Sequence, residues 1–109
     1  MGDSYLVEFW AQQMFGHAFE LAMPLIEQKF GSNRKKDWSE IIQFAYHTRN
    51  GCYHGNKFNI QKNSISTFVS TKWENIEIKY SDDGKKVSQG FMWPADFICL
   101  LYDLQNSLK

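Results

Sequence analysis

The chain has 109 residues, with 12 basic and 12 acidic side chains and a formal net charge of zero. This length, within the usual ~100–200 residues per domain, predicts one domain over residues 1–109 and excludes a two-domain enzyme with a separate cofactor fold. Zero net charge excludes a globally basic nucleic-acid coat protein. A composition of 43% hydrophobic and 17% aromatic residues predicts a packed core rather than a disordered chain.

The sequence carries no recognisable signal for export or membrane anchoring. Its longest apolar run, residues 97–102, is far shorter than the ~18 residues of a spanning helix. The N-terminal residues resemble no secretory signal, and Leu6 stands where a myristoylation signal has Ser or Thr. We therefore expect a cytoplasmic protein without a membrane partner, in which Cys52 and Cys99 are reduced core thiols.

The first predicted element is an amphipathic helix over about Ser4 to Phe30. Its apolar residues recur at three- and four-residue spacings, and they are Leu6, Phe9, Trp10, Met14, Ala18, Leu21, Ala22 and Leu25. Ser4 is the predicted N-cap. Pro24 lacks a backbone donor and is expected to kink or end the helix near Met23.

A second helix follows a predicted capping box, with Asp37 as the N-cap and Glu40 three residues later. It is expected to run to about Cys52 or His54. Gly55–Asn56 is expected to supply the left-handed turn that ends it.

A β-hairpin is predicted near residues 74–92. Residues 76–80 alternate apolar and polar side chains, residues 82–84 have the composition of a turn, and residues 85–87 are expected to form the returning strand.

The closing element is a helix with Pro94 at its first position and an apolar stripe of Phe97, Leu101, Leu104 and Leu108. Together the elements predict a mainly α protein, an up-and-down helical bundle with an inserted hairpin.

Polar, titratable and glycine residues gather in residues 47–57. At ~100° per residue, one sector of the second helix is apolar and the opposite stripe is polar. The apolar sector contains Trp38, Ile41, Ile42, Ala45 and Cys52, and the polar stripe, expected to face outward, contains Glu40, Gln43, His47, Asn50 and His54. Arg49 falls in the apolar sector, about 140° from His54.

Three explanations for the position of Arg49 remain open. Its guanidinium pairs internally with an acid such as Glu20, Asp96 or Asp103, because a buried charge needs a partner. Alternatively, Gly51 distorts the helix so that Arg49 and His54 share one pocket. In the third explanation, Arg49 lies beside His54 of a second chain across a two-fold axis.

The pattern Arg49-Asn50-x-x-x-His54 is similar to the R-x4–6-H signature of HEPN domains (higher eukaryotes and prokaryotes nucleotide-binding), in which a polar residue often follows the arginine. Gly55 after the histidine also resembles many members. A long first helix, a capped second helix ending in the motif and a closing amphipathic helix are similar to the family's bundle, whereas the hairpin departs from it.

The resemblance implies a metal-independent endoribonuclease that acts on RNA as a homodimer, with two copies of the motif lining the interface. Many members look like toxins or defence effectors, so an antitoxin or regulatory protein is a further expected partner. Other members have lost activity and serve as modules that bind nucleotides, nucleic acid or proteins, and this alternative stays open.

The residue types suit that chemistry. Cleavage of RNA without metal removes a proton from a 2′-hydroxyl, stabilises a charged phosphorane and protonates the departing 5′-oxygen. His54 is the candidate acid or base, because an imidazole titrates near neutral pH. Arg49 offers donors suited to the phosphorane, and Asn50 is expected to orient the imidazole or bind a phosphate oxygen.

Lys57 and His47 are the predicted RNA-binding residues beside this motif. His47 and His54 lie seven residues apart, about 10.5 Å along a helix, which disfavours a zinc site. We expect no metal or cofactor. Cys52 falls in the apolar sector, where thiols are usually inert.

The charges are distributed unevenly along the chain. Residues 1–28 carry −4, residues 29–72 carry +6 and residues 73–109 carry −2. The motif lies in the basic block, which permits a local phosphate-binding site if those lysines gather near His54.

Overall fold

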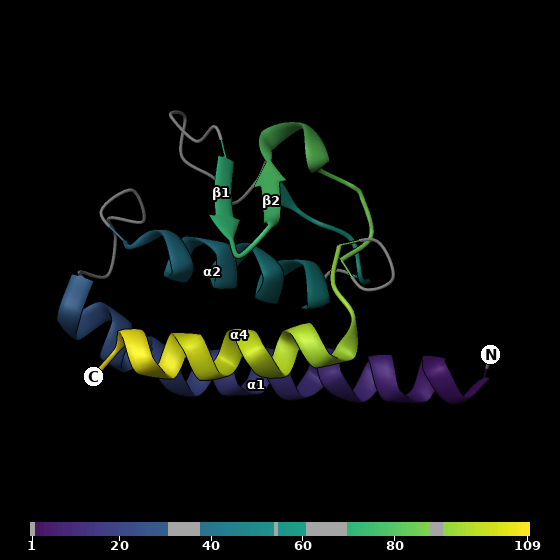
Figure 1. Cartoon of the computed structure of the whole chain (residues 1–109), viewed down its shortest axis with the longest axis horizontal. Helices are drawn as coiled ribbons and strands as arrows, with labels where there is room; N and C mark the ends of the chain where they lie inside the picture. The colour runs from purple at the N-terminus through teal and green to yellow at the C-terminus, as the bar shows by residue number, and fades with distance from the viewer. Residues whose placement is uncertain (1, 31–37, 54, 61–69, 88–90) are drawn as a thin grey trace.

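The computed structural model describes residues 2–30, 38–53, 55–60, 70–87 and 91–109. Its elements are α1 (Gly2–Phe30), α2 (Glu40–Tyr53), β1 (Ser70–Trp73), β2 (Ile76–Lys79), the 3-10 helix η2 (Tyr80–Asp82) and α4 (Pro94–Ser107). Figure 1 shows α1 and α4 side by side and parallel, with α2 antiparallel to both and the hairpin on the opposite side of α2. The prediction of a mainly α fold with an inserted β-hairpin is confirmed.

Helix α1 is longer and more continuous than the sequence predicts. It begins at Gly2, before the expected N-cap Ser4, and it continues through Pro24 to Phe30. Pro24 removes one helical hydrogen bond, but Ile26 beyond it is fully buried. Burial of Ile26 therefore compensates for the lost hydrogen bond. Pro24 was expected either to kink the helix or to end it near Met23, and the helix does not end there.

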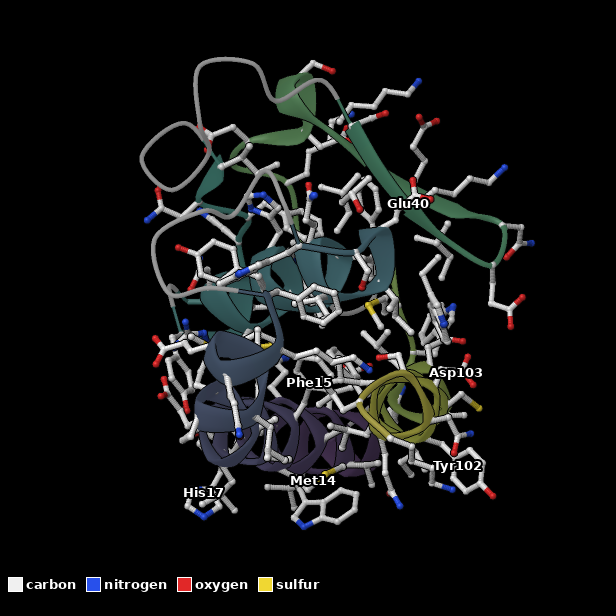
Figure 2. All side chains as sticks on the ribbon, turned by 90° about the vertical axis from the view of Figure 1, so that its left-hand side faces the viewer. Met14, Phe15, His17, Glu40, Tyr102 and Asp103 are labelled. Atoms are coloured by element: carbon white, nitrogen blue, oxygen red, sulfur yellow. The ribbon has the colours of Figure 1, made fainter. Side chains whose placement is uncertain are left out.

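One face of α1 forms part of the core. Ala11, Phe15 and Phe19 are fully buried and recur at four-residue spacing, as expected for a helix packed on one side. In Figure 2, Phe15 points from α1 toward the other helices, whereas Met14 and His17 point away from α2.

Helix α2 is the middle layer of the molecule. It packs against α1 and α4 on one side and against β1 on the other, so side chains around most of its circumference are buried. The helix begins at Glu40 rather than at the predicted capping box, and Asp37 lies outside the described residues. Glu40 connects α2 to β1 by two hydrogen bonds. Its Oε2 accepts from the backbone N of Lys72 at 3.1 Å, and its carbonyl accepts from Thr71 Oγ1 at 2.9 Å.

The hairpin pairs different segments from those predicted. Residues 76–79 form a strand as expected, but they pair antiparallel with the preceding residues 70–73, in the register Thr71 opposite Ile78. Its turn lies at residues 74–75, where Glu74 has a φ of 55°, and no glycine marks that turn in the sequence. The predicted hairpin turn at residues 82–84 is therefore wrong.

Asp82 explains why the chain leaves the sheet after Lys79. Its buried carboxylate accepts a hydrogen bond from the backbone N of Lys79 at 2.8 Å and forms an ion pair with Lys85 at 2.9 Å. These contacts close a 3-10 turn in place of a hairpin turn.

Residues 85–87, the expected returning strand, run beside residues 56–58 instead. Phe58 N donates to the carbonyl of Lys85 at 2.9 Å, and Val87 N donates to that of Asn56 at 3.1 Å. Val87 is fully buried against Gly51 of α2, where a Cβ at position 51 would lie 2.4 Å from Val87 Cγ2. Gly51 therefore permits this segment to close over the end of α2.

Helix α4 begins with Pro94, as predicted, and Asp96 Oδ2 accepts a hydrogen bond from the backbone N of Trp93 at 2.8 Å. Asp103 Oδ2 accepts from Trp73 Nε1 at 2.9 Å and so ties β1 to α4. Cys99 is exposed on this helix rather than in the core, which corrects the sequence expectation.

Candidate functional site

The predicted motif ends where α2 ends. The helix stops at Tyr53, and Gly55 and Asn56 follow with φ values of 72° and 64°, which confirms the predicted left-handed turn. His54, the predicted acid or base, lies outside the described residues. The residues around it form the described part of the site.

Arg49 pairs within its own chain. Its Nη1 donates to Glu20 Oε1 on α1, forming an ion pair whose side chains are 15% exposed for the arginine and 47% exposed for the acid. Glu20 is one of the three acids named from the sequence. Arg49 Nε is enclosed and has no hydrogen-bond partner among the described residues.

Three aromatic rings surround this guanidinium. Its central carbon lies 5.4 Å from the ring centre of Phe19 and 5.6 Å from those of Tyr46 and Tyr53. Rings at such distances stabilise a cation through their negative faces. An arginine in the apolar sector of the helix is therefore stabilised by one carboxylate and by these rings.

The ring of Tyr53 reaches α1 because position 16 is a glycine. A Cβ on Gly16 would lie 2.4 Å from Tyr53 Cε1, so any larger residue would push the ring away. This close approach joins the end of α2 to α1 beside Arg49.

His47 and Asn50 are buried, at 5% and 8% exposure. The expectation that they face outward is wrong, because the hairpin side of α2 is covered as well as the α1 side. His47 packs edge-on against the ring of Tyr46 with 5.4 Å between centres, and Asn50 Nδ2 has no hydrogen-bond partner among the described residues. The structure thus brings neither side chain to the surface where Lys57 lies.

A polar pocket of about 510 Å³ opens at the end of α2. Its walls come from α1, from the end of α2 with the turn after it, and from the segment at residues 85–87. The lining residues are Glu8, Phe9, Gln12, Gln13, Cys52, Gly55, Asn56 and Lys86. Cys52 and Gly55 flank His54 in the sequence, so this pocket adjoins the predicted catalytic segment.

Two exposed lysines lie opposite one another next to this pocket. Lys57, predicted as an RNA-binding residue, forms an isolated antiparallel bridge with Lys86. Like charges directly opposite each other across a strand pair destabilise it, and neither lysine forms an ion pair with another described residue. A bound anion would relieve this repulsion.

Sequence reasoning missed four of the pocket residues, Glu8, Gln12, Gln13 and Lys86. Glu8 and Gln12 lie on the buried face of α1 together with Ala11 and Phe15, and a polar pair on an otherwise apolar face is a signal that could have identified them. No sequence signal identified Lys86, because it reaches the site through a pairing that the predicted hairpin did not include.

Cys52 is not suited to act as a nucleophile. Burial raises the pKa of its thiol to about 12, so the thiol stays protonated at neutral pH, and the protonated form does not attack. Its contribution to the pocket is steric.

The chain matches no protein-family model, no curated protein and no solved structure.

Proposed function

We propose that this protein is a cytoplasmic, metal-independent endoribonuclease in which His54 and Arg49 serve the reaction, as the resemblance to HEPN domains implies. Asn50 is buried, so of its two expected roles we retain only the orientation of the imidazole. The observation that carries the proposal is the polar pocket beside the motif, with the Lys57–Lys86 pair at its side. Two cations that form no ion pair with another described residue, next to a polar hollow, are suited to an RNA backbone, because phosphate contacts supply most of the affinity for nucleic acid.

In this proposal Arg49 exchanges Glu20 for a phosphate. A carboxylate that is 47% exposed is held less firmly than a buried one, because water screens the ion pair. The guanidinium is already oriented by the rings of Phe19, Tyr46 and Tyr53, so little side-chain entropy is lost when a phosphate binds. The positive charge would then stabilise the phosphorane.

His54 supplies the proton transfers. One imidazole accepts the proton of the 2′-hydroxyl and another group donates a proton to the 5′-oxygen. A homodimer with the motif at its interface would provide the second histidine, and an antitoxin or regulatory protein would be a further partner.

The test compares the wild type, His54→Ala and His17→Ala on single-stranded RNA in the presence of a chelator. His17 is an exposed histidine on α1 and provides the matched control. We expect His54→Ala to lose at least ~100-fold in cleavage rate, within the usual ~10²–10⁴-fold contribution of a general acid or base, while His17→Ala retains the wild-type rate. Equal cleavage by all three proteins would contradict the proposal.

A second candidate is a catalytically inactive module that binds RNA or a nucleotide through the same surface. It is favoured by the pairing of Arg49 with Glu20 and by the enclosure of Arg49 Nε, because a guanidinium held in this way is suited to a structural role. This candidate predicts that wild type and His54→Ala bind RNA equally and that neither cleaves it.

A further inference from the structure

Two largely buried side chains turn their polar groups toward the open space of the pocket. Glu8 and Gln12 are each 8% exposed and line the hollow. Neither side chain forms a hydrogen bond or ion pair with another described residue. Neither group is among the polar atoms that the protein encloses without a partner, so the carboxylate and the amide face the open space of the pocket. Both are therefore available to a ligand that enters it.

The chemistry of the lining restricts that ligand. A simple cation would satisfy Glu8, but Lys86 lines the same pocket and would repel it. The side-chain amides of Gln12 and Gln13 also offer donors, which a cation cannot use. The ligand must therefore present donors to the carboxylate and an acceptor to an amide within one small molecule or group.

A guanine base presents that combination on one edge. Its N1–H and its exocyclic amino group are adjacent donors, and its O6 is an acceptor beside them. A carboxylate only accepts, through two oxygens, so it matches two adjacent donors. Adenine and cytosine each present one donor next to an acceptor, and uracil presents one donor between two acceptors. With any of these bases, one carboxylate oxygen would face an acceptor or would have no donor to bind.

The remaining walls suit a nucleotide. Phe9 lines the pocket and is 55% exposed, which leaves a ring face on which a base can stack. Lys86, and Lys57 across the bridge from it, lie where a phosphate attached to the base would find cations. A volume of about 510 Å³ falls within the ~300–1,000 Å³ of small-ligand sites.

We propose that this pocket is a guanine-binding site, in which Glu8 accepts from N1–H and the exocyclic amino group, Gln12 donates to O6 and Phe9 packs on the base. The inference deepens the proposed function, because a base pocket beside the motif would select guanine in an RNA substrate. It concerns binding alone, and its test requires no turnover.

The test titrates the full chain with GMP, AMP, CMP and UMP by calorimetry. We expect GMP to bind at least tenfold more tightly than the others and Glu8→Gln to weaken GMP at least tenfold, since a bidentate base contact typically contributes ~1–3 kcal/mol and 1.4 kcal/mol corresponds to tenfold. Glu27→Gln makes the same change at an exposed position of α1, and it should leave GMP binding unchanged.

Two results would overturn the inference: no preference for GMP, or equal loss from Glu8→Gln and Glu27→Gln. If Glu8→Gln does not fold, Phe9→Ala at an exposed position replaces it, and unaltered GMP binding by that variant overturns the stacking site.

A second arm distinguishes RNA from free nucleotide as the source of the guanine. The His54→Ala protein is titrated with single-stranded hexamers that contain or lack guanine, and tighter binding of the guanine-containing hexamer supports a site on RNA. Selective GMP binding without hexamer discrimination supports the pocket and assigns it to a free nucleotide. A wild type that binds GMP but cleaves no RNA retains this inference and refutes the ribonuclease proposal.

Discussion

Arg49 and Glu20 form an ion pair that joins α2 to α1, and the same guanidinium is the predicted phosphate ligand of the motif. Because the guanidinium cannot bind Glu20 and a phosphate fully at the same time, the carboxylate competes with any substrate. The rings of Phe19, Tyr46 and Tyr53 hold the guanidinium in place in either state. One residue therefore contributes both to the stability of the helix pair and to the proposed site.

Glu20→Gln separates these two contributions. We expect it to lower the free energy of unfolding by only about 1 kcal/mol, because the pair is partly exposed, and to tighten RNA binding several-fold by removing the competing charge. Arg49→Ala also loses the ring contacts and should cost more, about 2–3 kcal/mol. Urea denaturation and RNA titration measure the two effects, with the exposed Glu27→Gln as the control. Weaker RNA binding by Glu20→Gln would contradict competition.

The contact between Gly51 and Val87 predicts a rescue. Gly51→Ala places a methyl group against Val87 Cγ2 and should destabilise the protein by about 1–3 kcal/mol, as overpacking does. Val87→Ala leaves a cavity and should also be destabilising. The double variant should be more stable than the sum of the two losses implies, because each change relieves the other. Additive losses in a double-mutant cycle would show that the two side chains do not oppose one another.

The two cysteines should differ in alkylation. Cys99 is exposed, whereas Cys52 is buried and its thiol has a pKa of about 12. At pH 8 in the folded protein, iodoacetamide should modify Cys99 alone, and Cys52 should react only after unfolding, which mass spectrometry of digested protein would detect. Modification of Cys52 at a comparable rate would contradict its burial.

The same thiol predicts a pH dependence of stability. The unfolded chain releases the Cys52 proton near pH 9, whereas the folded chain retains it to about pH 12. Its stabilising contribution is therefore complete below pH 9 and falls as the pH rises toward 12. Cys52→Ala should unfold with a weaker pH dependence across this window, and an unchanged dependence would contradict the assignment.

The proposed dimer can be tested on two leucines of α1. Leu6 and Leu21 have almost the same exposure, 66% and 68%, but Leu6 lies one turn from the pocket residue Phe9, whereas Leu21 faces a groove shared with α4. If the motif lies at the interface, Leu6→Asp should shift the protein toward monomer in sedimentation experiments and Leu21→Asp should not. The reverse result would place any interface elsewhere.

Periodicity was sufficient to predict the helices, because each contributes at least one continuous apolar stripe to the core. It was insufficient for the orientation of α2, since a helical wheel assumes that one face of a helix is solvated. His47 and Asn50 are buried because α2 packs against α1 and α4 on one side and against β1 on the other, which leaves less of its circumference to solvent than the wheel assumes. The hairpin was predicted from residues 76–79, but its partner strand was not, because the turn at Glu74 lacks the glycine by which such turns are usually recognised.

The site could be predicted only in part, for related reasons. Glu20 could be named as a partner of Arg49 because a cation in an apolar sector requires an acid. Glu8 was not named as a site residue from the sequence, although its four-residue spacing from Gln12 on a buried face distinguished it. Lys86 could not have been predicted, because its position depends on the pairing of residues 56–58 with residues 85–87.

The bridge between Lys57 and Lys86 has a consequence for the response of the protein to salt. Added ions screen the repulsion between the two ammonium groups, so the ligand-free protein should become more stable as ionic strength rises. The same ions compete with phosphate and weaken its binding. Stability and anion affinity should therefore change in opposite directions with salt. Lys79 is exposed on β2 and does not lie opposite another lysine, so replacing it should alter neither salt dependence.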